Sequence, residues 1–250
     1  MSSESAPPSA SALFERSLAT LVRSWEYLAS GSPGARVSEP AGAAIAAFVR
    51  PPEREFLNNA VLVPGAADLG ATLGTIEHTY GTHGIERYAI WVHESEPEVA
   101  AELRARGYRF ETATRTMAMA VAELAAVEIS RLDLVPADLE EFWRLAGVEG
   151  LAPELPASGA HFYVARSGGV NAATLMAFDH DRDCGIYMVG TVPAARRQGL
   201  ATALSALAVA EAGTRGCITA SLQATEMAVG VYARVGFRDL GRFEEYVRSR

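Results

Sequence analysis

The amino-acid sequence predicts an α/β (α+β) fold made of two copies of one unit. Apolar runs with strand character alternate with helical patterns along the chain. In the second half, a strand-like run over 186–192 leads into a basic turn that contains glycine, and a helix of small residues begins at Leu200. Several turn residues also recur at a spacing of 129 residues, namely Pro64 and Pro193, Gly70 and Gly199, and Gly107 and Gly236. We interpret this spacing as a duplication.

In the first half, helices are predicted where apolar residues recur every three to four positions, and strands where short apolar runs lie between turn residues. Pro97 is acceptable in the first turn of a helix, and Gly107 ends that helix. The predicted elements are a helix over 13–28, a Gly/Ser/Pro linker over 31–40, strands over 41–48 and 60–63, a helix over 69–80, a strand over 88–93, a helix over 97–106 and a strand over 108–119.

The second half repeats this alternation from about residue 128. The segment HDRD over 180–183 is typical of a tight hairpin turn, and 147–159 is a loop rich in Gly, Pro, Ala and Glu. The predicted elements are a helix over 135–145, strands over 161–166, 171–179 and 184–192, a helix over 200–212, a strand over 217–222, a helix over 226–234 and a strand over 243–247.

The turn before Leu200 has the properties of an anion site. The first N–H groups of a helix lack intrahelical partners, and the helix dipole attracts negative charge there. Gly199 has no Cβ to hold a bulky anion away, while Arg196 and Arg197 supply positive charge. These residues predict a seat for a pyrophosphate.

The spacing Arg196-x-x-Gly199-x-Ala201, preceded by Val192-Pro193, resembles the acyl-CoA-binding motif of the GCN5-related N-acetyltransferases (GNAT). The phosphate fingerprints GxxxxGK[ST] and GxGxxG are both absent. The resemblance implies two tandem GNAT-like acyl-CoA N-acyltransferase domains, each a mixed, mostly antiparallel sheet flanked by helices. It also implies acetyl-CoA as co-substrate.

The resemblance also implies roles for individual residues. Tyr232, which precedes a Gly-Phe pair at 236–237, would be the general acid that protonates the leaving thiol. Thr225 stands where the family often has an asparagine that contacts the CoA arm. The backbone would bind pantetheine at Val189, Gly190 and Thr191. The pyrophosphate would be held by Arg196, Arg197, Gln198, Gly199, Leu200, Ala201 and Thr202.

One departure from the family pattern concerns the general base. Some members carry a glutamate twelve residues before the tyrosine, and the residue here is Ala220. An ordered water or another carboxylate would have to replace it. The candidate carboxylates are Glu149, Glu154, Asp179 and Glu226, and none stands out.

The 129-residue spacing predicts a degenerate domain over 12–125 and a catalytic domain over 126–250, and the Ser/Ala/Pro-rich composition of 1–11 predicts a disordered tail. At the positions that match Arg196, Arg197 and Ala201, the first copy has Ala67, Asp68 and Thr72. Asp68 would place negative charge where a pyrophosphate binds. We therefore expect only the second copy to bind CoA, with the first acting as a scaffold or as one wall of the acceptor pocket.

Composition limits the partners and the compartment. The net charge of −8 argues against a nucleic-acid surface and favours cationic partners such as amines. No apolar run approaches the roughly 20 residues of a membrane span, and the N-terminal residues do not resemble a signal peptide, so we expect a cytoplasmic protein. Two cysteines and five histidines without metal-ligand spacing predict no metal site. The sequence leaves open whether the protein forms a homodimer.

Two functions compete at this point. The first is acetyl transfer from acetyl-CoA to a primary amine, either a small molecule or a peptide amine, in a ternary complex. The second is a CoA-binding sensor or scaffold without turnover, which Ala220 favours and Tyr232 opposes. Sequence alone does not identify the acceptor, because substrate choice depends on the site and not on the fold.

Overall fold

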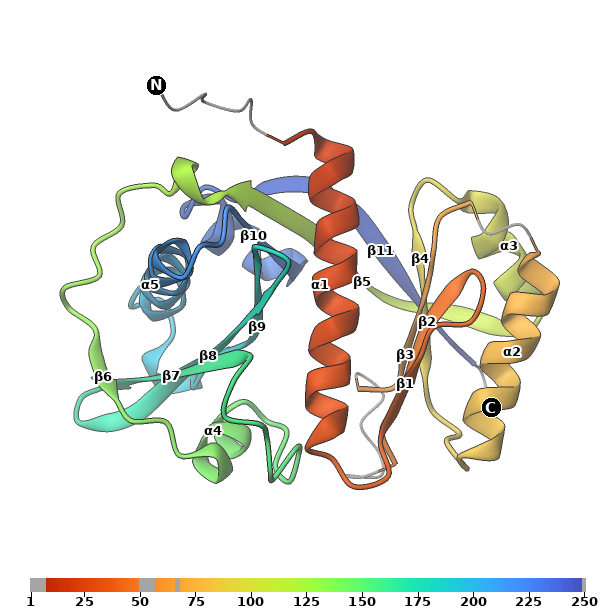
Figure 1. Ribbon diagram of the computed structural model, residues 1–250, viewed down its shortest axis with the longest axis horizontal. Coiled ribbons are helices and arrows are strands. Elements are labelled where there is room, and N and C mark those ends of the chain that lie inside the picture. The colour runs from red at the N-terminus through yellow and green to blue at the C-terminus, as the bar shows by residue number, and fades with distance from the viewer. Residues whose placement is uncertain (1–7, 50–56, 66–67, 249–250) are drawn as a thin grey trace. The chain divides into compact units, whose positions relative to one another are not determined.

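The computed structural model describes residues 8–49, 57–65 and 68–248 (Figure 1). The chain divides into two compact units, and each is discontinuous in sequence. Among the described residues, unit 1 comprises 8–21, 116–147 and 158–240, and unit 2 comprises 22–49, 57–65, 68–115, 148–157 and 241–248. The predicted domains over 12–125 and 126–250 stay a prediction. Residues 1–7 of the predicted tail lie outside the described residues.

Unit 1 contains a mixed sheet in the strand order β5-β10-β9-β8-β7-β6. Its own strands are β6 (Asp133–Val135), β7 (Ala160–Ser167), β8 (Val170–His180), β9 (Asp183–Thr191) and β10 (Thr219–Thr225). Its helices are α4 (Leu139–Leu145), α5 (Leu200–Thr214) and α6 (Val229–Ala233), with short 3₁₀ turns at Val121–Glu123, Pro193–Ala195 and Glu226–Ala228. Strands β6 to β9 pair antiparallel in sequence, and β9 and β10 are parallel.

Unit 2 contains a sheet in the order β1-β2-β3-β4-β11. Its own elements are β1 (Arg36–Ser38), β2 (Ala43–Ala47), β3 (Asn59–Leu62), α2 (Leu69–Thr82), β4 (Ala89–His93) and α3 (Pro97–Ala105). Three elements contribute residues to both units, namely α1 (Ala10–Ser30), β5 (Tyr108–Ala120) and β11 (Arg238–Arg248).

The two units share a local topology. Each contains one parallel strand pair joined by a helix, β3-α2-β4 in unit 2 and β9-α5-β10 in unit 1. In both, the second strand of the pair is followed by a helix and a glycine with positive φ, at Gly107 and Gly236. The strand that follows each glycine does not pair with the strand before it. Strand β5, which follows Gly107, neighbours β10, and β11, which follows Gly236, pairs with β4.

The unit 1 sheet separates two environments. The face toward α5 forms a hydrophobic cluster, because β9 and β10 direct Cys184, Ile186, Ala220 and Leu222 to this side. Small residues along α5 let the helix pack closely, and Leu204 is fully buried there, which stabilises the fold by about 1.5–3 kcal/mol. The opposite face of β10 meets the N-terminal half of α1 (Figure 1).

Unit 2 has its own core beneath α2 and α3, which lie on the same side of its sheet in Figure 1. Tyr80 of α2 stacks on Tyr88 with 4.0 Å between ring centroids. Tyr88 in turn shares a hydrogen bond with Tyr108. On the other face, Trp25 of α1 packs edge-on against Trp91, whose indole N–H donates to Asn59.

Several segments differ from the predicted elements. Helix α1 begins at Ala10, inside the predicted tail, and strand β11 begins at Arg238, five residues before its predicted start. The helix expected over 135–145 is shorter, because Asp138 caps it by accepting from the Glu141 N–H, and 133–135 form strand β6 instead. The predicted linker over 31–40 includes the short strand β1. Strand β10 begins at Thr219, two residues after its predicted start, and extends to Thr225.

Candidate functional site

Strand β9 carries a bulge where it passes the predicted cofactor residues. Tyr187 is opposite Met176, but Gly190 is opposite Thr174, so β9 has one extra residue between these pairs. Met188 has a φ of 51°, and its carbonyl accepts a hydrogen bond of 3.0 Å from the Thr174 hydroxyl. A Cβ at Gly190 would lie 3.1 Å from that hydroxyl oxygen, so glycine lets the two strands approach closely.

The parallel pairing between β9 and β10 stops at the bulge. Its last register pair is Ile186 with Leu222, although β9 continues to Thr191 and β10 to Thr225. The backbone of Val189 to Thr191 therefore has no parallel partner strand in this register. Backbone groups along this segment are positioned to bind an extended ligand.

The loop after β9 turns the chain sharply into α5. Residues Pro193–Ala195 form a 3₁₀ turn, Arg197 has a φ of 64° and Gly199 has a φ of 83°. Gly199 is the N-cap of α5 and makes no side-chain capping bond. A Cβ at Gly199 would meet no protein atom within 4 Å, so the start of α5 borders open space at Gly199.

Arg196 and Arg197 are both exposed beside this helix start. Arg196 donates from Nε to the Thr191 carbonyl at 3.2 Å, which anchors its side chain to the end of β9. Gln198 is held by a 2.8 Å hydrogen bond from Ser167. The structure thus brings the predicted residues 196–202 together at one helix end.

The equivalent helix of unit 2 has a different start. The carboxylate of Asp68 caps α2 by accepting from the Ala71 N–H at 2.9 Å. The side chain of Thr72 donates to the Asp68 carbonyl. An anion at this helix would compete with the protein's own carboxylate, whereas α5 has no such competitor among the described residues. Ala67, the predicted counterpart of Arg196, lies outside the described residues.

A pocket of about 620 Å³ borders the start of α5 in unit 1. Gly199, Leu200 and Thr202 form one side of it. Its charged lining consists of Arg131, Arg166, Arg234, Glu128 and Asp133. No sequence pattern indicates these three arginines, because they come from three separate segments with no motif spacing. With Glu128 and Asp133 in the same lining, the three arginines leave one net positive charge beside the start of α5.

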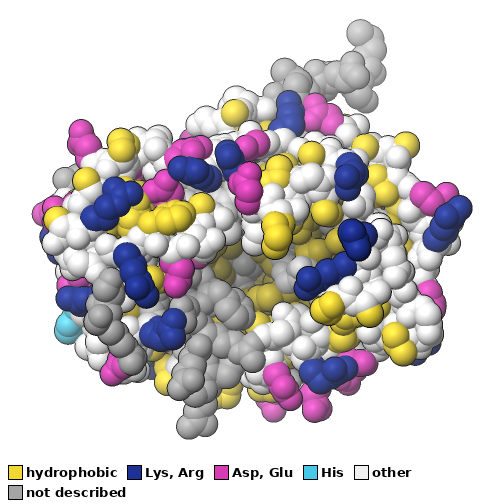
Figure 2. Space-filling view, turned by 180° about the vertical axis from the view of Figure 1, so that it is seen from behind, with side chains coloured by type: hydrophobic (Ala, Val, Ile, Leu, Met, Phe, Trp, Pro, Cys, Tyr) yellow, Lys and Arg dark blue, Asp and Glu magenta, His cyan; other side chains and the backbone are white. Residues whose placement is uncertain are grey.

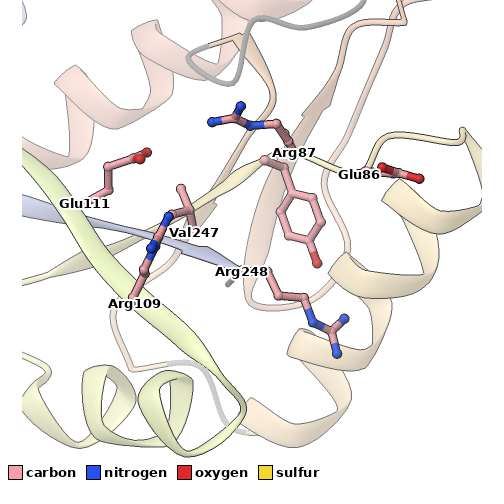
Figure 3. Close-up of a pocket in the computed structure, with 7 residues that line it drawn as sticks. Glu86, Arg87, Arg109, Glu111, Val247 and Arg248 are labelled. Atoms are coloured by element: carbon pink, nitrogen blue, oxygen red, sulfur yellow. The ribbon is translucent and has the colours of Figure 1, made fainter. Parts of the chain in front are cut away.

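A smaller pocket of about 200 Å³ lies in unit 2. It is lined by Glu86, Arg87, Tyr88, Arg109, Glu111, Val247 and Arg248 (Figure 3). Figure 3 shows the guanidinium groups of Arg87 and Arg248 pointing to opposite sides. Because they do not converge, and because no helix start among the described residues borders this pocket, it is a weaker candidate for a phosphate group.

Tyr232 lies on α6 within the hydrophobic cluster of unit 1 and is 7% exposed. Its ring packs edge-on against Phe237, with 6.0 Å between centroids. Burial raises the pKa of its phenol to about 12, so the hydroxyl stays protonated at neutral pH. Thr225 is exposed at the end of β10, where its side chain makes no capping bond.

The candidate bases for the reaction differ in their surroundings. Asp179 is at the far end of β8, opposite Cys184, and it binds Arg215 through both carboxylate oxygens. Burial raises the pKa of Asp179, but the Arg215 hydrogen bond and charge outweigh burial and leave it lowered. Glu149, Glu154 and Glu226 are exposed. Ala220 is fully buried among apolar residues, where a carboxylate would be costly.

Charges of both signs are interspersed on the face shown in Figure 2, with hydrophobic side chains between them. Within 8–49, 57–65 and 68–248, no group of three or more His, Cys, Asp or Glu side chains is arranged to hold a metal ion. No helix in these ranges combines the length and the apolar character that crossing a bilayer requires.

The comparisons with known proteins address the same part of the chain. Residues 126–237 match the acetyltransferase (GNAT) family. This GNAT segment contains β9, α5, β10 and Tyr232, and hence every residue of the predicted site. No match was found among curated protein sequences.

Solved structures of GNAT proteins share the fold over nearly the whole chain. A GCN5-related N-acetyltransferase from Kribbella flavida is 20% identical, with a TM-score of 0.66 over 92% of this chain and 95% of that one. One from Sphaerobacter thermophilus is 16% identical, with a TM-score of 0.56 over 97% and 94%. A tandem GNAT protein from the clavulanic acid biosynthesis pathway is 14% identical, with a TM-score of 0.56 over 96% of both chains. The family match and these neighbours support an acyltransferase.

Proposed function

We propose that the protein transfers an acetyl group from acetyl-CoA to a primary amine, in a ternary complex on the GNAT segment. The observation that carries this proposal is the contrast between two helix starts. Helix α5 begins at a left-handed glycine without a capping side chain and beside two exposed arginines, whereas Asp68 caps α2. Of these two helices, α5 alone offers its first N–H groups to a pyrophosphate.

The rest of CoA fits the surroundings of α5. The pantetheine would lie along Val189, Gly190 and Thr191, which have no parallel partner beyond the Ile186 pair. The adenosine end, with its further phosphate, would enter the pocket that Arg131, Arg166 and Arg234 line. Guanidinium groups bind phosphate through paired hydrogen bonds, which favours this orientation.

The transfer reaction has two stages, attack of the amine on the thioester and release of the CoA thiol. A neutral amine attacks the thioester carbonyl, and a backbone N–H of the 189–191 segment stabilises the oxyanion. The ammonium proton of the tetrahedral intermediate passes to an ordered water, and the C–S bond breaks as the carbonyl re-forms. Tyr232 donates its proton to the leaving sulfur and regains one from solvent. Since burial keeps the phenol protonated, Tyr232 can act as an acid but not as the base that deprotonates the amine.

Calorimetric titration with acetyl-CoA tests the binding step, and CoA release across a panel of amines tests transfer. We expect binding to one site and release that depends on the amine. If acetyl-CoA binds and no amine is acetylated, the sensor or scaffold function replaces transfer. If no binding heat is detected, both functions are excluded.

Replacing Tyr232 with phenylalanine should lower the turnover number by about 100-fold or more, because the general acid is lost. The ring and its contact with Phe237 remain, so the affinity for acetyl-CoA should change less than about twofold. Tyr163→Phe is the matched control, since it removes a hydroxyl from the same hydrophobic cluster but one that binds Glu211. Equal turnover in the two variants would exclude Tyr232 as the acid.

We also propose that the chain arose by tandem duplication, with a first copy that has lost CoA binding. The shared strand–helix–strand topology and the Asp68 cap support this history. A cytoplasmic location, a small-molecule or peptide amine as acceptor and the option of a homodimer stay predictions from the sequence.

A further inference from the structure

Unpartnered polar atoms gather on the face of the unit 1 sheet that is opposite α5. The Gln223 amide oxygen and the hydroxyls of Thr20 and Thr116 are each buried and have no hydrogen-bond partner among the described residues. Thr20 is fully buried and Thr116 is 1% exposed. Buried polar atoms in proteins are almost always paired, so a group of unpaired ones indicates a missing partner.

These atoms belong to one cluster. The Gln223 side-chain N–H donates to the Ser17 hydroxyl of α1 at 3.4 Å, and Thr20 follows Ser17 by three residues, on the same side of the helix. The Val121 N–H bonds the Ile218 carbonyl, and β5 runs toward this bond while β10 runs away from it. Carried along the two strands, this antiparallel register places Thr116 opposite Gln223. We call Ser17, Thr20, Thr116 and Gln223 the Gln223 cluster.

The cluster lies next to the place where β9 and β10 stop pairing. Gln223 is the first residue of β10 after the last pair, which joins Leu222 and Ile186. Leu222 faces α5, and alternation along the strand directs Gln223 to the other face. A thioester held along 189–191 would reach this level of the sheet, so a group bound by the cluster would be near it.

We propose that the Gln223 cluster is the subsite that positions the acceptor, and that it selects an amine that bears hydroxyl groups and no carboxylate. This proposal rests on the transfer function proposed above. The Gln223 amide oxygen can only accept a hydrogen bond, which suits an amine N–H. The two threonine hydroxyls can donate or accept, which suits substrate hydroxyls. All four side chains of the cluster are uncharged, so a carboxylate on the acceptor would lose its hydration without gaining a cation.

Three amines of one carbon skeleton test the proposal. Serinol carries an amine and two hydroxymethyl groups, isopropylamine has methyl groups in their place, and serine replaces one hydroxymethyl group with a carboxylate. At saturating acetyl-CoA, we expect kcat/KM for serinol to exceed that for each of the other two by about 10-fold, mainly through KM. Gln223→Leu and Thr116→Val should each lower the serinol value about 10-fold and leave the calorimetric affinity for acetyl-CoA unchanged.

Thr219→Val is the matched control. Its hydroxyl is also buried and unpartnered on the same face of β10, but Thr219 pairs with Asp183 at the other end of the strand. Equal loss in Thr116→Val and Thr219→Val would overturn the subsite, and so would an acceptor profile that Gln223→Leu does not change. Acetylation of other amines in that case would leave the transfer function standing. Absence of acetyl-CoA binding by the wild type would remove both proposals.

Discussion

Replacing Gly199 with valine is expected to weaken acetyl-CoA binding by about 100-fold. Gly199 has a φ of 83°, and the space where its Cβ would project is empty of protein atoms within 4 Å. A valine side chain would therefore project into this open space at the start of α5, where we propose that the pyrophosphate binds. Loss of one or two charge-assisted hydrogen bonds, each of about 1.5–3 kcal/mol, corresponds to a change of this size. Isothermal titration calorimetry measures it directly.

Gly216→Val separates this effect from backbone strain. Gly216 follows the other end of α5 and has a φ of 100°, and a Cβ added there would also meet no protein atom within 4 Å. A β-branched residue at either position costs about 1–2 kcal/mol of unfolding free energy, since left-handed φ values disfavour it. Both variants should lose similar stability, and only Gly199→Val should lose binding. Equal affinities would place the pyrophosphate elsewhere.

The second large effect concerns Glu245 in unit 2. This residue is opposite Trp91 in the β4–β11 pair, on the same strand face as Phe243 and Val247. Burial, together with the negative charge of Glu111, raises the pKa of Glu245 from 4.5 to about 7. The folded state therefore favours the protonated acid, and this stabilisation is present below pH 4.5 and lost as the pH rises through 7. The loss amounts to about 3 kcal/mol at most.

Glu245→Gln should remove this pH dependence, because glutamine has no proton to lose. At pH 5 the variant and the wild type should unfold at similar temperatures, and at pH 8 the variant should unfold about 5–10 °C higher. Calorimetric scans at the two pH values measure the difference. A wild type that unfolds no earlier than the variant at pH 8 would show that ionised Glu245 costs nothing in the folded state.

Two further variants identify the source of the effect. Glu111→Gln removes a negative charge that raises the pKa of Glu245, so the loss of stability should be complete at a lower pH and be smaller than in the wild type. Glu98→Gln, at an exposed site on α3, is the control that should leave the pH profile unchanged. The same calorimetric scans apply to both variants.

Much of the fold is predictable because its elements carry strong local patterns. The apolar spacing along 13–28 and the apolar run 88–93 correspond to α1 and β4. Periodicity starts helix α4 too early, because Asp138 caps the helix through a hydrogen bond that periodicity does not register. Strand β1 has no local signal, because its three residues are held by pairing with β2.

The candidate site is predictable where one segment contains it. Residues 189–202 are contiguous, and their order of strand, basic turn and helix indicates an anion site. The bulge at Met188 is not predictable in this way, because it arises from the register between β8 and β9. No local pattern marks Arg131 or Arg234 as part of a pocket. Gln223 becomes a candidate site residue only because two other elements place buried hydroxyl groups near it.

The discontinuity of the compact units limits how the gene can be shortened. A fragment starting at residue 126 would lack the end of β5, which neighbours β10, and the α1 residues that meet Gln223. It would also keep 241–248, whose partner strand β4 would be gone. Such a fragment exposes an unpaired strand edge, a template for aggregation, and would be recovered in inclusion bodies. Crystallisation of the acetyl-CoA complex therefore calls for the whole polypeptide.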